Sequence, residues 1–220
     1  MPVTGLLRTI LLATLALVLD TTLAVEPCAP FQDGRVDAEM IQLMRQAAKN
    51  GRLYRVDPAA SRVGFCVRHF PGQEFRGEFN NIVGGFVFPP VLGQHGQALL
   101  LIHTADLSSE STSLLPLVTG QQFMDTDRYP DILFVGHTAH WQTALQGHIH
   151  GDLTLRGITR PVTFDVHVHA LEGSEDDRPG RILLEGRSQV ERREFDMNSH
   201  RFFVSQTVRL CLAVELLPWQ

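Results

Sequence analysis

Apolar and polar residues alternate with a period of two along most of the chain from residue 53 onward, and the pattern is clearest over residues 147–170. Ile149 and Leu153 fall on one face of the first half, and Phe164 and Val166 fall on one face of the second half. Alternation of this length predicts two antiparallel strands, each with one face in a core. The two apolar faces must coincide, so the numbers of paired residues must add to an odd sum.

The opposite face of this hairpin is unusually rich in histidine. We expect a register with a sum of 317, which centres the turn on residues 157–159. Directly opposed side chains have Cβ atoms about 4.5–5.5 Å apart, so opposed histidines are close enough to share one Zn or Cu ion. The alternative is a solvated face that binds no ligand. The register pairs His150 with His167, His148 with His169, and Asp152 with Asp165.

The rest of the chain also reads mainly as strands, punctuated by glycine-rich and proline-rich turns. Residues 37–50 instead have the apolar spacing, N-cap and glycine stop of a helix, and residues 111–123 predict a short helix or folded loop. Short strands in this number favour a sandwich or a barrel. The strands are expected at 53–57, 62–69, 74–80, 83–89, 97–106, 132–140, 146–156, 161–170, 181–192 and 206–217.

The first 24 residues have the pattern of a secretion signal. Arg8 precedes an apolar run over residues 10–19, and Thr22-Leu23-Ala24 provides small residues for cleavage. The run is too short to span a bilayer. We therefore expect a signal peptide at 1–24, an N-terminal extension at 25–52 and one domain at 53–217, exported to the periplasm.

Composition narrows the function classes. The 220-residue chain is 44% hydrophobic, which is typical of a folded domain with a sizeable core. Its net charge of −5 gives no reason to expect a nucleic-acid partner. No nucleophile-elbow, zinc-protease, phosphate-loop or dinucleotide motif is present, so the sequence favours a protein that is not an enzyme.

The three cysteines are Cys28, Cys66 and Cys211. Cys66 and Cys211 both fall on the polar faces of their strands, so a disulfide between them requires that these two strands be neighbours. Cys28 competes for either partner. The odd number leaves one thiol free or bonded between chains, so a homodimer stays open.

The ordered motifs between residues 53 and 217 resemble those of the YceI-like family. They include Tyr54-Arg-Val-Asp57, Phe75-Arg-Gly-Glu-Phe79 and Tyr129-Pro130. The hairpin motif from Gly151-Asp-Leu-Thr154 to Thr159-Arg-Pro-Val162 is the most specific match. The chain departs from the family pattern at two places. One is Asp196, where the family has glycine after its late phenylalanine, and the other is the sequence of residues 114–122.

The resemblance implies an all-β fold, an extended eight-stranded antiparallel lipocalin-like barrel that binds a polyisoprenoid or another long amphiphilic lipid. Here the barrel would be preceded by an N-terminal helix and crossed by a short one. Such a tunnel needs apolar walls, although each apolar residue has ordinary core packing as its alternative. The expected lining residues are Phe65, Val67, Phe79, Phe86, Phe123, Phe134, Leu153 and Phe164.

The histidine face supports a second hypothesis from another class. If His148, His150, His167 and His169 held Zn or Cu with an open position, the protein would be a metal-binding protein or a metal-dependent hydrolase. No cofactor is required by the lipid-binding hypothesis. His69, on the apolar face of its strand, is expected to be a core histidine.

Overall fold

The computed structural model describes residues 31–32, 35–36, 42, 44–46, 52–88, 97–171 and 180–218. The strands are β1 (Phe31–Gln32), β2 (Arg35–Val36), β3 (Arg52–Val56), β4 (Arg62–His69), β5 (Gln73–Phe79), β6 (Ile82–Phe88), β7 (Gln97–His103), β8 (Asp131–Trp141), β9 (Gln146–Leu155), β10 (Ile158–Ala170), β11 (Ile182–Glu191) and β12 (Val204–Pro218). The α-helix α2 (Leu115–Thr119) and four short 3-10 helices, η1 (Pro58–Ala60), η2 (Thr104–Asp106), η3 (Thr112–Leu114) and η4 (Arg192–Phe195), connect some of them.

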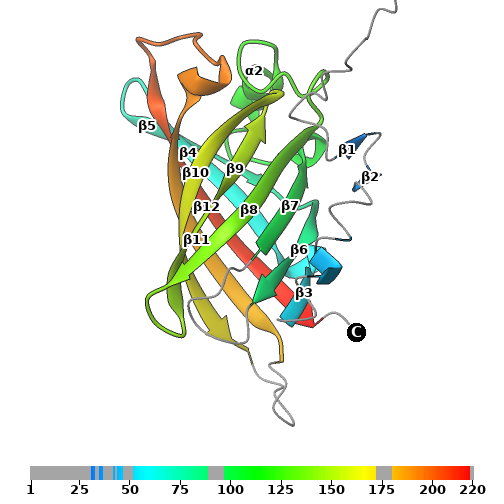
Figure 1. Cartoon of the computed structure of the whole chain (residues 1–220). Helices are drawn as coiled ribbons and strands as arrows, with labels where there is room; N and C mark the ends of the chain where they lie inside the picture. The colour runs from blue at the N-terminus through cyan, green and yellow to red at the C-terminus, as the bar shows by residue number, and fades with distance from the viewer. Residues whose placement is uncertain are drawn as a thin grey trace, which may run out of the picture.

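The main sheet closes into an antiparallel barrel of eight strands (Figure 1). Neighbouring strands run from β6 through β7, β8, β9 and β10 to β11, and β11 closes the ring by pairing with β12. The other edge of β12 pairs with β4 along most of its length and with β3 at its end. Closure removes the exposed sheet edges that would otherwise invite aggregation.

Two of the eight barrel strands are broken in the middle. β3 and β4 are two halves of one bent strand separated by η1, and β5 and β6 are halves of the next strand, separated at Asn80-Asn81. β3 pairs with β6 and β4 pairs with β5, so both breaks occur at the same level of the barrel. Asp57 starts the first break, because its carboxylate accepts a hydrogen bond from the Ala59 backbone N–H at 3.2 Å.

The alternating apolar residues fill one end of the barrel with a close-packed core. Tyr54, Leu184, Val214 and Leu216 are each at most 2% exposed there. A separate small cluster lies outside the sheet, where Met44 packs against apolar side chains of β6, β7 and β8. Because interiors of this kind pack densely, side chains fill this end of the barrel.

The ten strands expected from residue 53 onward all form, with ends that differ by three residues or fewer. The differences of three residues are at the start of β10 and at the end of β7, where the expected strand gives way to η2. Thr104 is buried there, and its hydroxyl donates a hydrogen bond to the Pro130 carbonyl at 2.8 Å. The short helix expected within 111–123 is α2, preceded by η3.

The expected register of the β9–β10 hairpin is wrong. Ile158 pairs with Leu155, so paired numbers sum to 313 rather than 317. The reason is the turn: Arg156 (φ 54°) and Gly157 (φ 70°) both have positive φ, as a two-residue type I′ hairpin turn requires. The odd sum, and therefore the shared apolar face, is as expected.

Several expectations lie largely or wholly outside the described residues. They include the signal peptide at 1–24, Cys28 and most of the helix at 37–50, of which residues 42 and 44–46 are described and are helical. Among the described residues, no helix has the length and apolar character needed to cross a bilayer.

Candidate ligand cavity

An apolar cavity of about 280 Å³ occupies the barrel between the packed core and the end that carries α2. Its wall comes from strands β4, β5 and β7 to β12, with α2 and the segment after η4 closing over it. The size is near the lower end of the roughly 300–1,000 Å³ that ligand sites usually occupy. In Figure 1 this end of the barrel lies at the top of the molecule.

Seven of the eight expected lining residues do line this cavity, namely Phe65, Val67, Phe79, Phe123, Phe134, Leu153 and Phe164. Two of them form one wall, where the rings of Phe134 and Phe164 meet edge to face with centroids 5.2 Å apart. Edge-to-face packing holds such rings in place and leaves their free faces available to an apolar ligand.

Phe86 does not line the cavity, so that expectation is wrong. Phe86 lies on β6 directly opposite Tyr54 of β3, in the packed end of the barrel, and is 3% exposed. Its side chain points to the interior as the alternation predicts. Its level along the barrel, set by the pairing of β3 with β6, places it in the core.

The opening of the cavity is marked by exposed aromatic side chains. Phe70, at the end of β4, is 72% exposed and Phe203, just before β12, is 60% exposed, yet both also line the cavity. Their rings meet edge to face with centroids 6.4 Å apart. An apolar surface therefore continues from solvent into the barrel at this point.

Among the described residues of the cavity wall, Arg192 is the one arginine, lysine or carboxylate side chain, and it is 1% exposed. Its guanidinium donates hydrogen bonds to the backbone carbonyls of Ser205, Met197 and Val204, and it lies 5.6 Å from the centre of the Phe123 ring. Desolvation lowers its pKa from the ordinary value for arginine. Each of its three nitrogens thus donates to a backbone carbonyl, and we assign this buried cation a structural role.

Two histidines provide the remaining polar side chains of the wall. His69 is half-buried, and its Nδ1 lies 3.1 Å from the Phe70 carbonyl oxygen. His200 is exposed and stacks on the Phe123 ring with centroids 5.8 Å apart. His69 was expected in the core, but it lies beside the opening, because β4 extends beyond the packed end.

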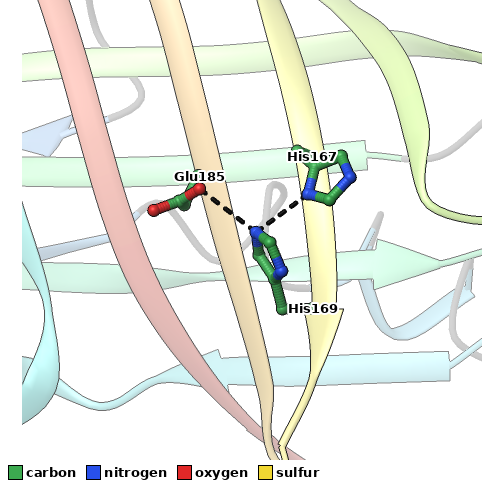
Figure 2. Close-up of side chains that lie close together, drawn as sticks. All are labelled: His167, His169 and Glu185. Carbon is green, nitrogen blue, oxygen red and sulfur yellow. Dashed lines mark hydrogen bonds and ion pairs between the residues drawn. The ribbon is translucent and has the colours of Figure 1, made fainter.

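The histidine face is arranged differently from the expectation. His148 lies opposite Asp165, with Nδ1 2.7 Å from the carboxylate Oδ1, and His150 lies opposite Thr163. The expected cluster of four histidines is therefore wrong, because the turn is centred two residues earlier and the partner of each residue shifts by four. His167 and His169 do come together, and they do so with Glu185 of β11 (Figure 2).

Cys66 and Cys211 are on the outer face of neighbouring strands β4 and β12, as expected, but both are free thiols, so the expected disulfide between them is wrong. The residue opposite Cys66 is Arg209, and the residue opposite Cys211 is Gly64, so the two cysteines are diagonal neighbours. Diagonal Cβ atoms lie several ångströms further apart than the 3.5–4.5 Å that a disulfide needs. Burial and the nearby Glu74 carboxylate raise the pKa of Cys66.

Sequence reasoning missed Arg192, His200 and the aromatic rim. A lone arginine at the end of an alternating strand carries no signal that separates a buried cation from a solvated one. Phe202 and Phe203 form an apolar pair beside Arg201 in a segment without periodicity. An exposed aromatic pair of this kind is the one local signal that could have been read as a rim.

Comparisons with known proteins agree with this architecture. A family model described as the YceI-like domain matches residues 54–216. Protein YceI of Escherichia coli O6:H1 is 26% identical over 166 residues, covering 74% of this chain and 85% of that protein. A UPF0312 protein of Shewanella denitrificans is 26% identical over 175 residues, covering 79% and 91%.

Solved structures show the same fold. BcnA of Burkholderia cenocepacia superposes with a TM-score of 0.64 at 21% identity, covering 73% of this chain and 98% of that one. A structure described as a polyisoprenoid binding domain from Saccharophagus degradans superposes with a TM-score of 0.57 at 13% identity, covering 76% and 98%. With the family model spanning the whole barrel, the chain belongs to the YceI-like domain family.

Proposed function

We propose that this protein binds a long apolar ligand, a polyisoprenoid or a similar lipid tail, inside the barrel and without catalysis. The observation that carries the proposal is the cavity: it is walled by aromatic and aliphatic side chains and is continuous with an apolar opening at Phe70 and Phe203. The polyisoprenoid-binding neighbour of the same fold supports the class of ligand.

Burial of a hydrocarbon tail supplies enough free energy for binding. Each methylene removed from water contributes about 0.8 kcal/mol, so ten of them contribute roughly 8 kcal/mol before the costs of ordering the ligand. The proposal does not require a polar anchor deep in the barrel. Arg192 offers little to a charged head group there, because its donors already bind three carbonyls.

We place the polar end of the ligand at the opening. His69 and His200 are the polar side chains of the wall that solvent reaches, and both adjoin the aromatic rim. A ligand that enters tail first leaves its head group beside these two rings. This orientation favours an amphiphile over a hydrocarbon with no polar end.

Export to the periplasm belongs to the same proposal. It rests on the signal pattern of the first 24 residues, and a carrier of membrane lipids has its use on the far side of the inner membrane. Fractionation of cells that express the full chain tests it. The proposal expects a shortened protein, cleaved near Ala24, in the periplasmic fraction, and a full-length protein in the cytoplasm would contradict it.

Ligand binding is tested by extracting the purified protein with organic solvent and measuring the lipid by mass spectrometry. Val67→Trp enlarges a half-buried side chain that faces the cavity, whereas Val83→Trp adds the same bulk on the outer face, where Val83 is 37% exposed. We expect co-purified lipid in the wild type and Val83→Trp, and a reduced amount in Val67→Trp. Equal amounts in both folded variants, or no lipid in the wild type, would refute the proposal.

A further inference from the structure

His167, His169 and Glu185 form a cluster on the outer face of the barrel (Figure 2), and none of them lines the ligand cavity. His167 and His169 are two residues apart on β10 and therefore share a face, and Glu185 lies directly opposite His167 on β11. One ligand atom from each residue lies within 4.8 Å of the other two. Two paired strands of a closed barrel hold the three side chains together.

The contacts in this cluster centre on one atom. His169 Nε2 is 2.8 Å from His167 Nδ1 and 3.1 Å from Glu185 Oε2. If Nε2 carries a hydrogen, both partners must accept that single hydrogen. If it does not, it presents a lone pair to an ionised carboxylate oxygen. Because Nε2 has at most one hydrogen, it cannot donate a separate hydrogen bond to each partner.

A divalent cation resolves this arrangement, because it accepts lone pairs from all three atoms. Ligand atoms about 2.0–2.1 Å from a tetrahedral ion lie roughly 3.4 Å from one another. The observed separations of 2.8 and 3.1 Å are about 0.6 and 0.3 Å shorter than this value, and the third pair of ligand atoms, from His167 and Glu185, lies within 4.8 Å. All three side chains are at least partly exposed, so small rotations are available to them.

We propose that His167, His169 and Glu185 bind one divalent transition-metal ion, Zn²⁺ or Cu²⁺. Two imidazoles and one carboxylate are a borderline donor set that suits these ions better than Mg²⁺ or Ca²⁺, which prefer oxygen ligands throughout. His167 and Glu185 also line a shallow surface groove, so water fills the remaining coordination position. The site is independent of lipid binding in the cavity.

The neighbouring charges are compatible with a bound cation. Arg187, the nearby cation of β11, lies opposite Asp165 rather than opposite either histidine of the cluster. His148 also contacts Asp165, at 2.7 Å, so the adjacent polar groups pair with one another. The carboxylate of Glu185 thus supplies the negative charge within the cluster itself.

Isothermal titration of the mature, tag-free protein with ZnCl₂, repeated with CuCl₂, tests the proposal. We expect one site, with binding weakened at least about tenfold in His169→Gln and in Glu185→Gln, since even outer partners of metal ligands are worth 10–100-fold. His150→Gln is the matched control, because His150 shares the histidine-rich face but contacts Thr163. We expect it to bind like the wild type.

A variant with Cys28, Cys66 and Cys211 replaced by serine separates this site from binding by thiolates. We expect it to retain the site. The proposal is overturned if the wild type binds neither ion at one site, if binding disappears in the cysteine-free variant, or if His150→Gln loses as much affinity as His169→Gln. Of the substituted side chains that the structure describes, all are on the outer face of the barrel, and circular dichroism of each variant verifies the fold.

Discussion

His148 and Asp165 face each other across β9 and β10, with Nδ1 2.7 Å from Oδ1, and this pair defines the register of the hairpin. The pairing moves each histidine of β9 away from the histidines of β10. It leaves His167 to face Glu185 on the next strand, β11, instead. A shift of four residues in the pairing thus decides which side chains meet on this surface.

The first prediction concerns the turn that sets this register. Gly157 has φ of 70°, where an added Cβ strains the backbone, and it would lie 3.3 Å from Tyr129 Cε1. We expect Gly157→Ala to lower the free energy of unfolding by about 1–2 kcal/mol, measured by urea unfolding. Gly157→Asn separates backbone strain from bulk: asparagine is larger than alanine but tolerates positive φ, so it should cost less. A greater loss for asparagine than for alanine would contradict the assignment to strain.

The second prediction concerns the contribution of Arg192 to stability. Arg192→Met removes the donors to the carbonyls of Ser205, Met197 and Val204 and leaves them in a buried environment. We expect a loss of about 3–5 kcal/mol in the free energy of unfolding, since removing one member of a buried polar network leaves its partners unpaired. The control is Arg193→Met, because the Arg193 side chain is 64% exposed and should change stability by less than about 0.5 kcal/mol. Similar effects at both positions would argue against a structural role for Arg192.

The third prediction concerns the reactivity of Cys66 and its dependence on pH. Burial, the Glu74 carboxylate and Cys211 all raise the pKa of Cys66, so fewer of these thiols are ionised at pH 8 than in an ordinary cysteine. The thiolate is the reactive form, so we expect iodoacetamide to modify Cys66 more slowly in the folded protein than after unfolding in urea. Peptide mass spectrometry over pH 7–10 measures both rates, and the difference should narrow as the pH rises.

The same shift fixes the sign of its effect on stability. The thiol ionises at lower pH in the unfolded chain than in the folded protein, so its contribution favours folding less as the pH rises above the ordinary cysteine value. Glu74→Gln removes one cause of the shift and should accelerate the modification of Cys66. A rate for Cys66 in the folded protein equal to that in the unfolded chain would contradict this account.

The strands were predictable because one side of the barrel wall faces an apolar interior and the other side faces water. This difference imposes the period of two on the sequence. Val162, Phe164, Val166 and Val168 are all buried along β10, as their spacing indicates. The register was not predictable from this pattern alone, because sums of 313 and 317 are both odd and both keep the apolar faces together. The two-residue turn at Arg156-Gly157 determines which of these two registers forms.

The cavity was predictable as a set of inward-facing residues but not as a boundary. Phe86 and Phe134 both alternate inward, yet Phe86 packs in the core and Phe134 lines the cavity, because they lie at different levels of the barrel. That level depends on strand pairings far apart in the sequence. The aromatic rim at Phe70 and Phe203 likewise depends on two distant segments meeting.

Native mass spectrometry of delipidated protein mixed with solanesol, a long isoprenoid alcohol, tests whether the cavity binds a long apolar tail. We predict a complex of one ligand per chain for the wild type and for Val83→Trp, and little or none for Val67→Trp, whose indole occupies the cavity. Absence of a complex with the wild type, or equal complex formation by the two tryptophan variants, would contradict the account.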